Sequence, residues 1–140
     1  MRVIRPAFVV IFWLASVLTA TAQAADQPAK SPIFETDILP IFKAKCASCH
    51  NPRAKKAELD LTTLDAVAKG GESGELIVGG KPDDSLLYEM IHEGLMPPED
   101  FKKPLTKAEI ETISRWIQAG AKSKNGDALS KADLVTQHDI

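Results

Sequence analysis

Two cysteines and a histidine stand together in the segment CASCH, which runs from Cys46 to His50. The 140-residue chain has no other cysteine. Thiols at this spacing are typical of a redox disulfide, of half a zinc site, or of the sequence Cys-x-x-Cys-His, to which haem is attached covalently. In the third case, Cys46 and Cys49 form thioethers with the two vinyl groups of one porphyrin, and His50 binds the iron.

The surrounding sequence favours haem over the other two kinds of site. A redox dithiol normally follows a strand and opens a helix, whereas a helical pattern precedes Cys46 and no strand–helix–strand pattern is visible. A structural zinc ion needs four ligands, and the other two histidines, His92 and His138, are far apart in the sequence. We therefore predict one haem c per chain, attached to Cys46 and Cys49, with His50 as an axial ligand of the iron.

Two candidates for the second axial ligand lie in an expected helix. Met90 shares the apolar face of this helix with leucine and isoleucine side chains, which indicates packing rather than ligation. His92 falls on the opposite face, where a solvated surface histidine is expected.

The third candidate, Met96, follows that helix. Pro97 and Pro98 stiffen the backbone directly after it, and this lowers the entropy cost of holding its sulfur in one place. A thioether ligand raises the reduction potential relative to imidazole and closes the iron to substrates. Local context thus favours Met96 as the second ligand, although a methionine that only fills a gap in the core stays open on these residues alone.

Four helices are expected to position these residues. The predicted segments are residues 31–46, interrupted at Pro40, a short helix within residues 59–71, a helix from Asp83 or Asp84 to Gly94, and a last helix that begins with the capping box Thr106-Lys107-Ala108-Glu109 and stops at Gly120. Glycine-rich and proline-containing loops join them, and no strand-type alternation is long enough for a sheet. We predict an all-α fold with long loops, in which the haem replaces part of the core.

The N-terminal segment has the pattern of a secretory signal. Arg2 and Arg5 precede an uncharged apolar run, and Ala22-Gln23-Ala24 offers the small-x-small site that signal peptidase reads. We predict a signal peptide over residues 1–24 and a periplasmic or otherwise exported protein. The alternative is an uncleaved anchor, the one case in which we expect a membrane contact.

The remaining chain divides into a short leader, one domain and a tail. We assign residues 25–31 to a flexible leader, residues 32–121 to the folded domain, and residues 122–140, which lack a sustained apolar face, to a flexible tail. Removal of residues 1–24 takes two arginines and no acidic residue from the 17 basic and 19 acidic residues, which leaves a net charge of −4. This acidic balance argues against nucleic acid as a partner.

Three segments resemble the planctomycete-type cytochrome c domain, a class I-like monohaem family. They are ILPIFKAKCASCH, LDLTTLDAVAKGGESGELIVGGKPDDSLLYEMI and MPPEDFKKPLTKAEIETISRWIQAGA, in the order of the family, and they cover nearly all of residues 38–121. The resemblance implies haem c on Cys46 and Cys49, iron ligation by His50 and by Met96, and packing of Trp116 near the haem. The chain has Lys56-Ala57-Glu58 where the family often has Gly-Gly.

These observations predict an electron-transfer protein rather than an enzyme: an exported monohaem cytochrome c that carries single electrons. Two alternatives stay open, namely an electron-entry subunit of a larger dehydrogenase, and a haem sensor or peroxidase with an open sixth position. The expected partner is a redox protein that is acidic at its docking site, because basic residues bracket CASCH and follow Met96. They are Lys43, Lys45, Arg53, Lys55, Lys56, Lys102 and Lys103.

Overall fold

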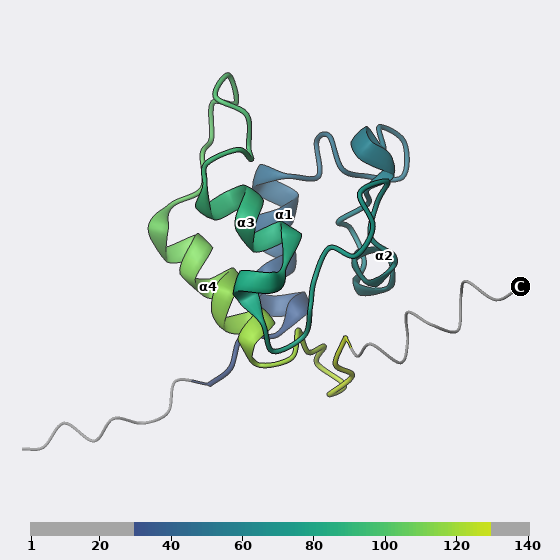
Figure 1. Cartoon of the computed structure of the whole chain (residues 1–140), viewed down its shortest axis with the longest axis vertical. Coiled ribbons are helices and arrows are strands. Elements are labelled where there is room, and N and C mark those ends of the chain that lie inside the picture. The colour runs from purple at the N-terminus through teal and green to yellow at the C-terminus, as the bar shows by residue number, and fades with distance from the viewer. Residues whose placement is uncertain (1–29, 130–140) are drawn as a thin grey trace, which may run out of the picture.

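The computed structural model describes residues 30–129 and contains four α-helices and no strand in this part of the chain (Figure 1). The helices are α1 (Leu39–Lys45), α2 (Leu64–Lys69), α3 (Leu86–His92) and α4 (Lys107–Gln118). The predicted all-α fold with long loops is therefore confirmed. The predicted signal peptide, residues 1–24, and residues 130–140 of the predicted tail lie outside the described residues.

The helix that leads to CASCH is built in two pieces. A π-helical turn, Phe34–Ile38, runs into α1, and Pro40, which has no backbone N–H, lies in the first turn of α1. Its last residue is Lys45, so α1 ends directly before the first cysteine. None of the helices in residues 30–129 is long and apolar enough to cross a membrane.

The core is centred on three aromatic side chains from the two ends of the domain. Trp116 of α4 is fully buried, and its ring lies 5.9 Å from that of Phe34 and 6.3 Å from that of Phe42, measured between centroids. Trp116 and Phe42 meet edge to face, an arrangement that aromatic pairs prefer. This cluster joins α4 to the helical segment before CASCH, and α3 packs against α4 as well.

The start of α3 differs from the prediction. We expected an aspartate at position 83 or 84 to cap it, but these residues form a 3-10 turn, Pro82–Asp84, and Ser85 is the N-cap residue. The Ser85 side chain is buried and serves the preceding loop instead, because its hydroxyl donates to the Lys81 carbonyl oxygen at 2.8 Å and accepts from the Val78 N–H at 2.9 Å. The helix ends at His92, and Gly94 then takes a positive φ of 70°.

α4 begins as its sequence predicted. Thr106 and Glu109 form both hydrogen bonds of a capping box, at 3.2 Å from the Glu109 N–H to the Thr106 hydroxyl and at 2.7 Å from the Thr106 N–H to the Glu109 carboxylate. This geometry fixes where the long loop between α3 and α4 ends.

Residues 122–129, which we assigned to the tail, return to the domain. The Lys122 carbonyl oxygen accepts hydrogen bonds from the Trp116 indole N–H at 3.1 Å and from the Phe34 N–H at 2.9 Å. The Lys124 N–H donates to the Glu35 carboxylate at 2.8 Å, and Leu129 packs against the core. The packed part of the chain therefore extends to Leu129.

Candidate functional site

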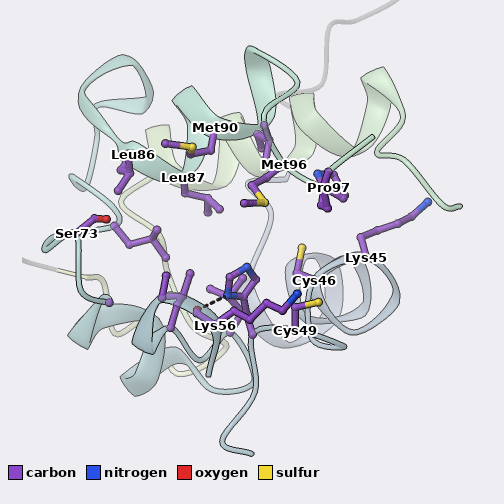
Figure 2. Close-up of a pocket in the computed structure, with 18 of the residues that line it drawn as sticks. Lys45, Cys46, Cys49, Lys56, Ser73, Leu86, Leu87, Met90, Met96 and Pro97 are labelled. Atoms are coloured by element: carbon purple, nitrogen blue, oxygen red, sulfur yellow. Dashed lines mark hydrogen bonds between the residues drawn. The ribbon is translucent and has the colours of Figure 1, made fainter. Parts of the chain in front are cut away.

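A cavity of about 330 Å³ lies between two walls that come from different parts of the chain (Figure 2). We call the first the attachment wall; it consists of Lys45, Cys46, Ser48, Cys49, His50, Lys56, Ala57, Leu59 and Leu61. We call the second the methionine wall; it consists of Leu86, Leu87, Met90, Ile91, Met96, Pro97, Pro98 and Phe101. A glycine-containing turn closes one side with Gly71, Ser73, Gly74 and Leu76.

The structure brings all four predicted site residues to this cavity. Cys46, Cys49 and His50 lie on the attachment wall and Met96 on the methionine wall. Figure 2 shows the Met96 side chain extending from its loop toward the side of the cavity that carries Cys46 and Cys49. His50 and Met96 are 46 positions apart in the sequence, so only the tertiary fold places them together.

The segment CASCH folds as a turn that continues α1. The Cys46 N–H donates to the Phe42 carbonyl oxygen at 2.8 Å, and the His50 N–H donates to the Cys46 carbonyl oxygen at 3.0 Å. Side chains three positions apart in a helical turn lie on the same face, which explains why Cys46 and Cys49 both reach the cavity. Both thiols are free.

The His50 ring is held by a single backbone hydrogen bond. Its Nδ1 lies 3.0 Å from the Lys56 carbonyl oxygen, and a carbonyl can only accept, so Nδ1 carries the proton. The lone pair of the ring then resides on Nε2. Histidines that bind metals almost always donate their second nitrogen in this way, because the bond fixes the tautomer and the ring orientation.

The loop that supplies the Lys56 carbonyl has an unusual backbone. Lys55, Ala57 and Glu58 have positive φ values of 38°, 55° and 52°, a region that side chains with a Cβ rarely occupy. These positions overlap Lys56-Ala57-Glu58, where the family resemblance led us to expect Gly-Gly, so the chain forms this turn without glycine. The turn is held from outside by the Glu72 N–H, which donates to the Ala57 carbonyl oxygen at 2.9 Å.

Gly71 makes this contact between the two loops possible. A Cβ on Gly71 would lie 2.5 Å from the Ala57 carbonyl oxygen, which is closer than real Cβ atoms approach. The glycine-containing turn can therefore press against the strained loop only because residue 71 lacks a side chain. In this way Gly71 supports the loop that orients His50.

Asn51 is a structural residue of the site that the sequence analysis missed. Its side-chain amide donates to the Ala47 carbonyl oxygen at 2.6 Å, and its side-chain oxygen accepts from the backbone N–H groups of Arg53 at 2.8 Å and Ala54 at 3.0 Å. Asparagine often forms such local turns, so its place directly after His50 was an available signal.

The electrostatics around Cys46 do not suit a redox dithiol. Burial raises the pKa of the Cys46 thiol to about 11, and the nearby negative charge of Glu109 adds to this shift, which Lys45 only partly offsets. Reactive dithiols work through a thiolate with a lowered pKa. Within residues 30–129, no three His, Cys, Asp or Glu side chains are grouped as ligands for a metal ion, so this part of the chain offers no zinc site.

The methionine wall contains a second sulfur, that of Met90, which we predicted to pack rather than to ligate the iron. Its side chain is half-buried and lines the cavity, as Met96 does. The two residues are also linked, because the Met96 N–H donates to the Met90 carbonyl oxygen at 2.9 Å. Met96 itself is 42% exposed.

His92 and Trp116 lie away from the cavity. The His92 side chain is exposed, as predicted, and its ring stacks against that of Tyr88 at a centroid distance of 5.1 Å. Trp116, which the resemblance places near the haem, is not among the cavity-lining residues and packs in the aromatic core instead. Its effect on the site therefore passes through Phe42, whose carbonyl oxygen accepts the first hydrogen bond of the CASCH turn.

The side chains around this cavity fit a covalently bound haem. The donor set is two thiols, an imidazole with a free Nε2 and a thioether on the opposite wall. Leucine, isoleucine, proline and phenylalanine side chains supply the apolar surroundings that a porphyrin disc needs. The residues that line the cavity therefore suit a haem without any substitution.

Comparison with known proteins agrees with this chemistry. Residues 46–100 match the family model described as Planctomycete cytochrome C. No curated protein and no solved structure matches the chain. The matched segment begins at Cys46 and ends after Met96, and it contains both cavity walls except for Lys45 and Phe101. This match supports the resemblance found in the sequence, and the matched family implies covalent haem c and electron transfer.

Proposed function

We propose that this protein is an exported monohaem cytochrome c that carries single electrons between redox proteins. One haem c is attached through Cys46 and Cys49, and His50 and Met96 are the axial ligands. The observation that carries the proposal is that these four side chains line one apolar cavity, with the imidazole on one wall and the thioether on the other. The haem, when bound, supplies an iron that changes its oxidation state by one electron.

His50 contributes a ligand atom whose position is fixed before the iron changes charge. The hydrogen bond from Nδ1 to the Lys56 carbonyl oxygen holds the ring, and the turn that contains Lys56 is pinned by its contacts to the glycine-containing turn. An electron carrier needs ligands that stay in place in both oxidation states, because any rearrangement adds to the barrier for transfer. This requirement explains why a strained loop is kept at residues 55–58.

Met96 contributes the second ligand and the closure of the site. A thioether favours the reduced iron relative to imidazole, so it raises the reduction potential. A ligated sixth position leaves no place for peroxide or a gas to bind, which separates an electron carrier from a haem peroxidase or sensor. The second candidate function is that of an electron-entry subunit in a larger dehydrogenase complex, because the same haem site would receive the electrons there.

The basic residues around the site suit an acidic redox partner. Six of the seven lysine and arginine side chains that bracket CASCH or follow Met96 are exposed, namely Lys43, Arg53, Lys55, Lys56, Lys102 and Lys103. Lys45 is the exception, because its side chain is only 15% exposed and is bound to other residues. Such a cluster would orient an acidic partner toward the cavity and accelerate encounter more than it tightens the complex.

Intact mass and visible spectra of the purified exported protein test this function. We expect one haem per chain that stays attached in denaturant, removal of residues 1–24, and a low-spin spectrum whose oxidised form shows a weak sulfur-to-iron band at long wavelength. A mass without haem would refute the cytochrome. A high-spin spectrum that changes on addition of peroxide or carbon monoxide would instead favour the peroxidase or sensor.

A further inference from the structure

The loop that carries Met96 is anchored at its two ends. Residues 95–105 form the green loop that projects between α3 and α4 in Figure 1. At its start the Met96 N–H donates to the Met90 carbonyl oxygen, and within it the Phe101 N–H donates to the Pro98 carbonyl oxygen, both at 2.9 Å. Both bonds join residues of the methionine wall, so neither ties the loop to the attachment wall.

The far end of the loop is held by a residue from the other wall. The Lys45 ammonium group donates to the Pro104 carbonyl oxygen at 2.9 Å across 59 positions of sequence. Lys45 is the last residue of α1 and directly precedes Cys46. The same residue therefore adjoins the haem-attachment turn and bonds to the end of the Met96 loop.

A second partner fixes the ammonium group of Lys45. The Glu109 carboxylate lies 3.6 Å from it, and the two side chains are 15% and 25% exposed. The carboxylate oxygen is itself held by the Thr106 N–H at 2.7 Å and the Thr106 hydroxyl at 3.0 Å. A shielded ion pair with this many bonds to rigid groups differs from a mobile surface ion pair, which contributes little to stability.

The titration of Glu109 agrees with a firmly held pair. Taken by itself, the burial of Glu109 would raise the pKa of its carboxyl group. The hydrogen bonds from the Thr106 backbone and hydroxyl, together with the charge of Lys45, outweigh this effect and leave the pKa below its ordinary value.

From these contacts we propose that Lys45 is a positioning residue, which keeps the Met96 thioether in the cavity by joining the attachment turn to the end of the Met96 loop. The proposal rests on His50/Met96 ligation as the proposed function. It also gives Lys45 a different role from the exposed basic residues around it: its charge is used inside the protein rather than offered to a partner.

The test measures how easily an external ligand displaces Met96. Imidazole is titrated into the oxidised, haem-loaded protein, and the sulfur-to-iron band is followed at the same time. We expect Lys45→Met, which keeps the apolar stem and removes the donors, to raise the apparent affinity for imidazole about tenfold. A hydrogen bond from a charged group is worth roughly the energy of a tenfold change in an equilibrium constant. Lys45→Arg should restore much of the wild-type affinity.

Two control variants separate positioning from general stability. Lys107→Met removes an exposed lysine at the start of α4, and Ala108→Gly lowers stability in the exposed first turn of α4 without removing a partner of Lys45. Both should stay within about twofold of the wild type in imidazole affinity, since a factor of two is only about 0.4 kcal/mol. The proposal is wrong if Lys45→Met also stays within that range, or if Ala108→Gly raises the affinity as much as Lys45→Met does.

Two further outcomes remain decisive. If Lys45→Met yields no haem-loaded protein, Glu109→Gln takes its place in the test, because glutamine retains the capping box while the ion pair with Lys45 is lost. A severalfold rise in the apparent affinity for imidazole then supports the proposal, and an unchanged affinity overturns it. A wild-type protein without a sulfur-to-iron band would refute Met96 ligation itself, whatever the Lys45 variants do.

Discussion

The two walls of the cavity are built by different means. The attachment wall is held by hydrogen bonds between residues close in sequence, such as those from Cys46 to Phe42 and from His50 to Lys56. The methionine wall has local bonds too, such as the one from Met96 to Met90, but the far end of its loop is held by Lys45 of the other wall. The His50 ring is thus held mainly within one stretch of the chain, with support from Glu72, whereas the Met96 loop also depends on a contact across 59 positions of sequence.

This difference suggests a division of labour. On the proposed ligation, the side that carries the attachment residues is organised mainly by one short segment. The side that carries Met96 depends more on a contact between distant segments. Loss of tertiary contacts should therefore affect the Met96 side first.

The largest expected effect comes from the attachment wall. Cys46→Ala together with Cys49→Ala should abolish covalent haem, and most of the chain should then lack a fixed structure, because the haem replaces part of the core. Intact mass spectrometry and near-ultraviolet circular dichroism measure both effects. A double variant that still retained haem in denaturant would disprove the attachment.

A substitution on the methionine wall should leave the haem attached but change its ligation. Met96→Leu should eliminate the sulfur-to-iron band and lower the reduction potential, while covalent haem and helix content stay close to the wild type. Met90→Leu is the matched control, since it removes the other sulfur of the same wall. If Met90→Leu eliminated the band and Met96→Leu did not, the ligand assignment would be reversed.

Charge reversal can decide which wall a partner approaches. Arg53→Glu with Lys55→Glu alters the exposed charge beside the attachment wall, and Lys102→Glu with Lys103→Glu alters that beside the methionine wall. Charge reversal of the pair that lies nearer the docking site should slow electron transfer to an acidic redox protein by about tenfold at 0.01 M salt. The difference should shrink at 0.15 M, where the Debye length falls from about 30 Å to about 8 Å. Stopped-flow rates that change with neither the charge reversals nor the salt concentration would show that these residues do not take part in docking.

The strained loop of the attachment wall offers a stabilising substitution. Ala57→Gly with Glu58→Gly should raise the free energy of unfolding by about 1 kcal/mol, because removing a Cβ at positive φ relieves more strain than the added chain entropy costs. Ala108→Gly, in the exposed first turn of α4, should instead lower it by a similar amount. Chemical denaturation of the haem-loaded variants measures both. Destabilisation by the Ala57 and Glu58 changes would show that the loop does not adopt this backbone.

The smallest expected effect is a pH dependence of the folding stability that arises from Glu109, the partner of Lys45. Because the pKa of Glu109 in the folded state lies below its ordinary value of 4.5, its contribution to stability is fully present above that pH and is lost as the pH falls through the folded value. Glu109→Gln should therefore flatten the loss of stability in acid, measured by denaturant midpoints. Glu111→Gln, an exposed neighbour on α4, should not.

Part of the remaining acid dependence should come from the other side of the domain. The Ile33 N–H donates to the Asp37 carboxylate at 2.8 Å, and this bond is the largest cause of the lowered pKa of Asp37. A Glu109→Gln protein with the full wild-type acid dependence would mean that Asp37 and other carboxylates carry all of it.

The sequence by itself determined the features that depend on neighbouring residues. The apolar periodicity before Cys46 predicted the helical segment that leads to CASCH, the capping box at Thr106 predicted the start of α4, and the absence of alternation predicted an all-α fold. Each of these follows from local hydrogen bonding or helical periodicity, which a linear pattern records directly. Met96 was predicted to reach the site from its adjoining prolines and from the family resemblance, and its side chain lines the cavity.

Only the tertiary structure decided the long-range contacts. Lys45 was assigned to a docking surface because the sequence shows a basic residue beside CASCH, whereas its partners, Pro104 and Glu109, lie about 60 positions away. Periodicity placed Met90 on the apolar face of α3, but it did not show that this face lines the cavity. The return of residues 122–129 rests on backbone atoms of Lys122 bonded to Trp116 and Phe34, and backbone atoms leave no pattern in the sequence. Contacts of this kind depend on how packed helices bring distant segments together, and that is a property of the folded chain as a whole.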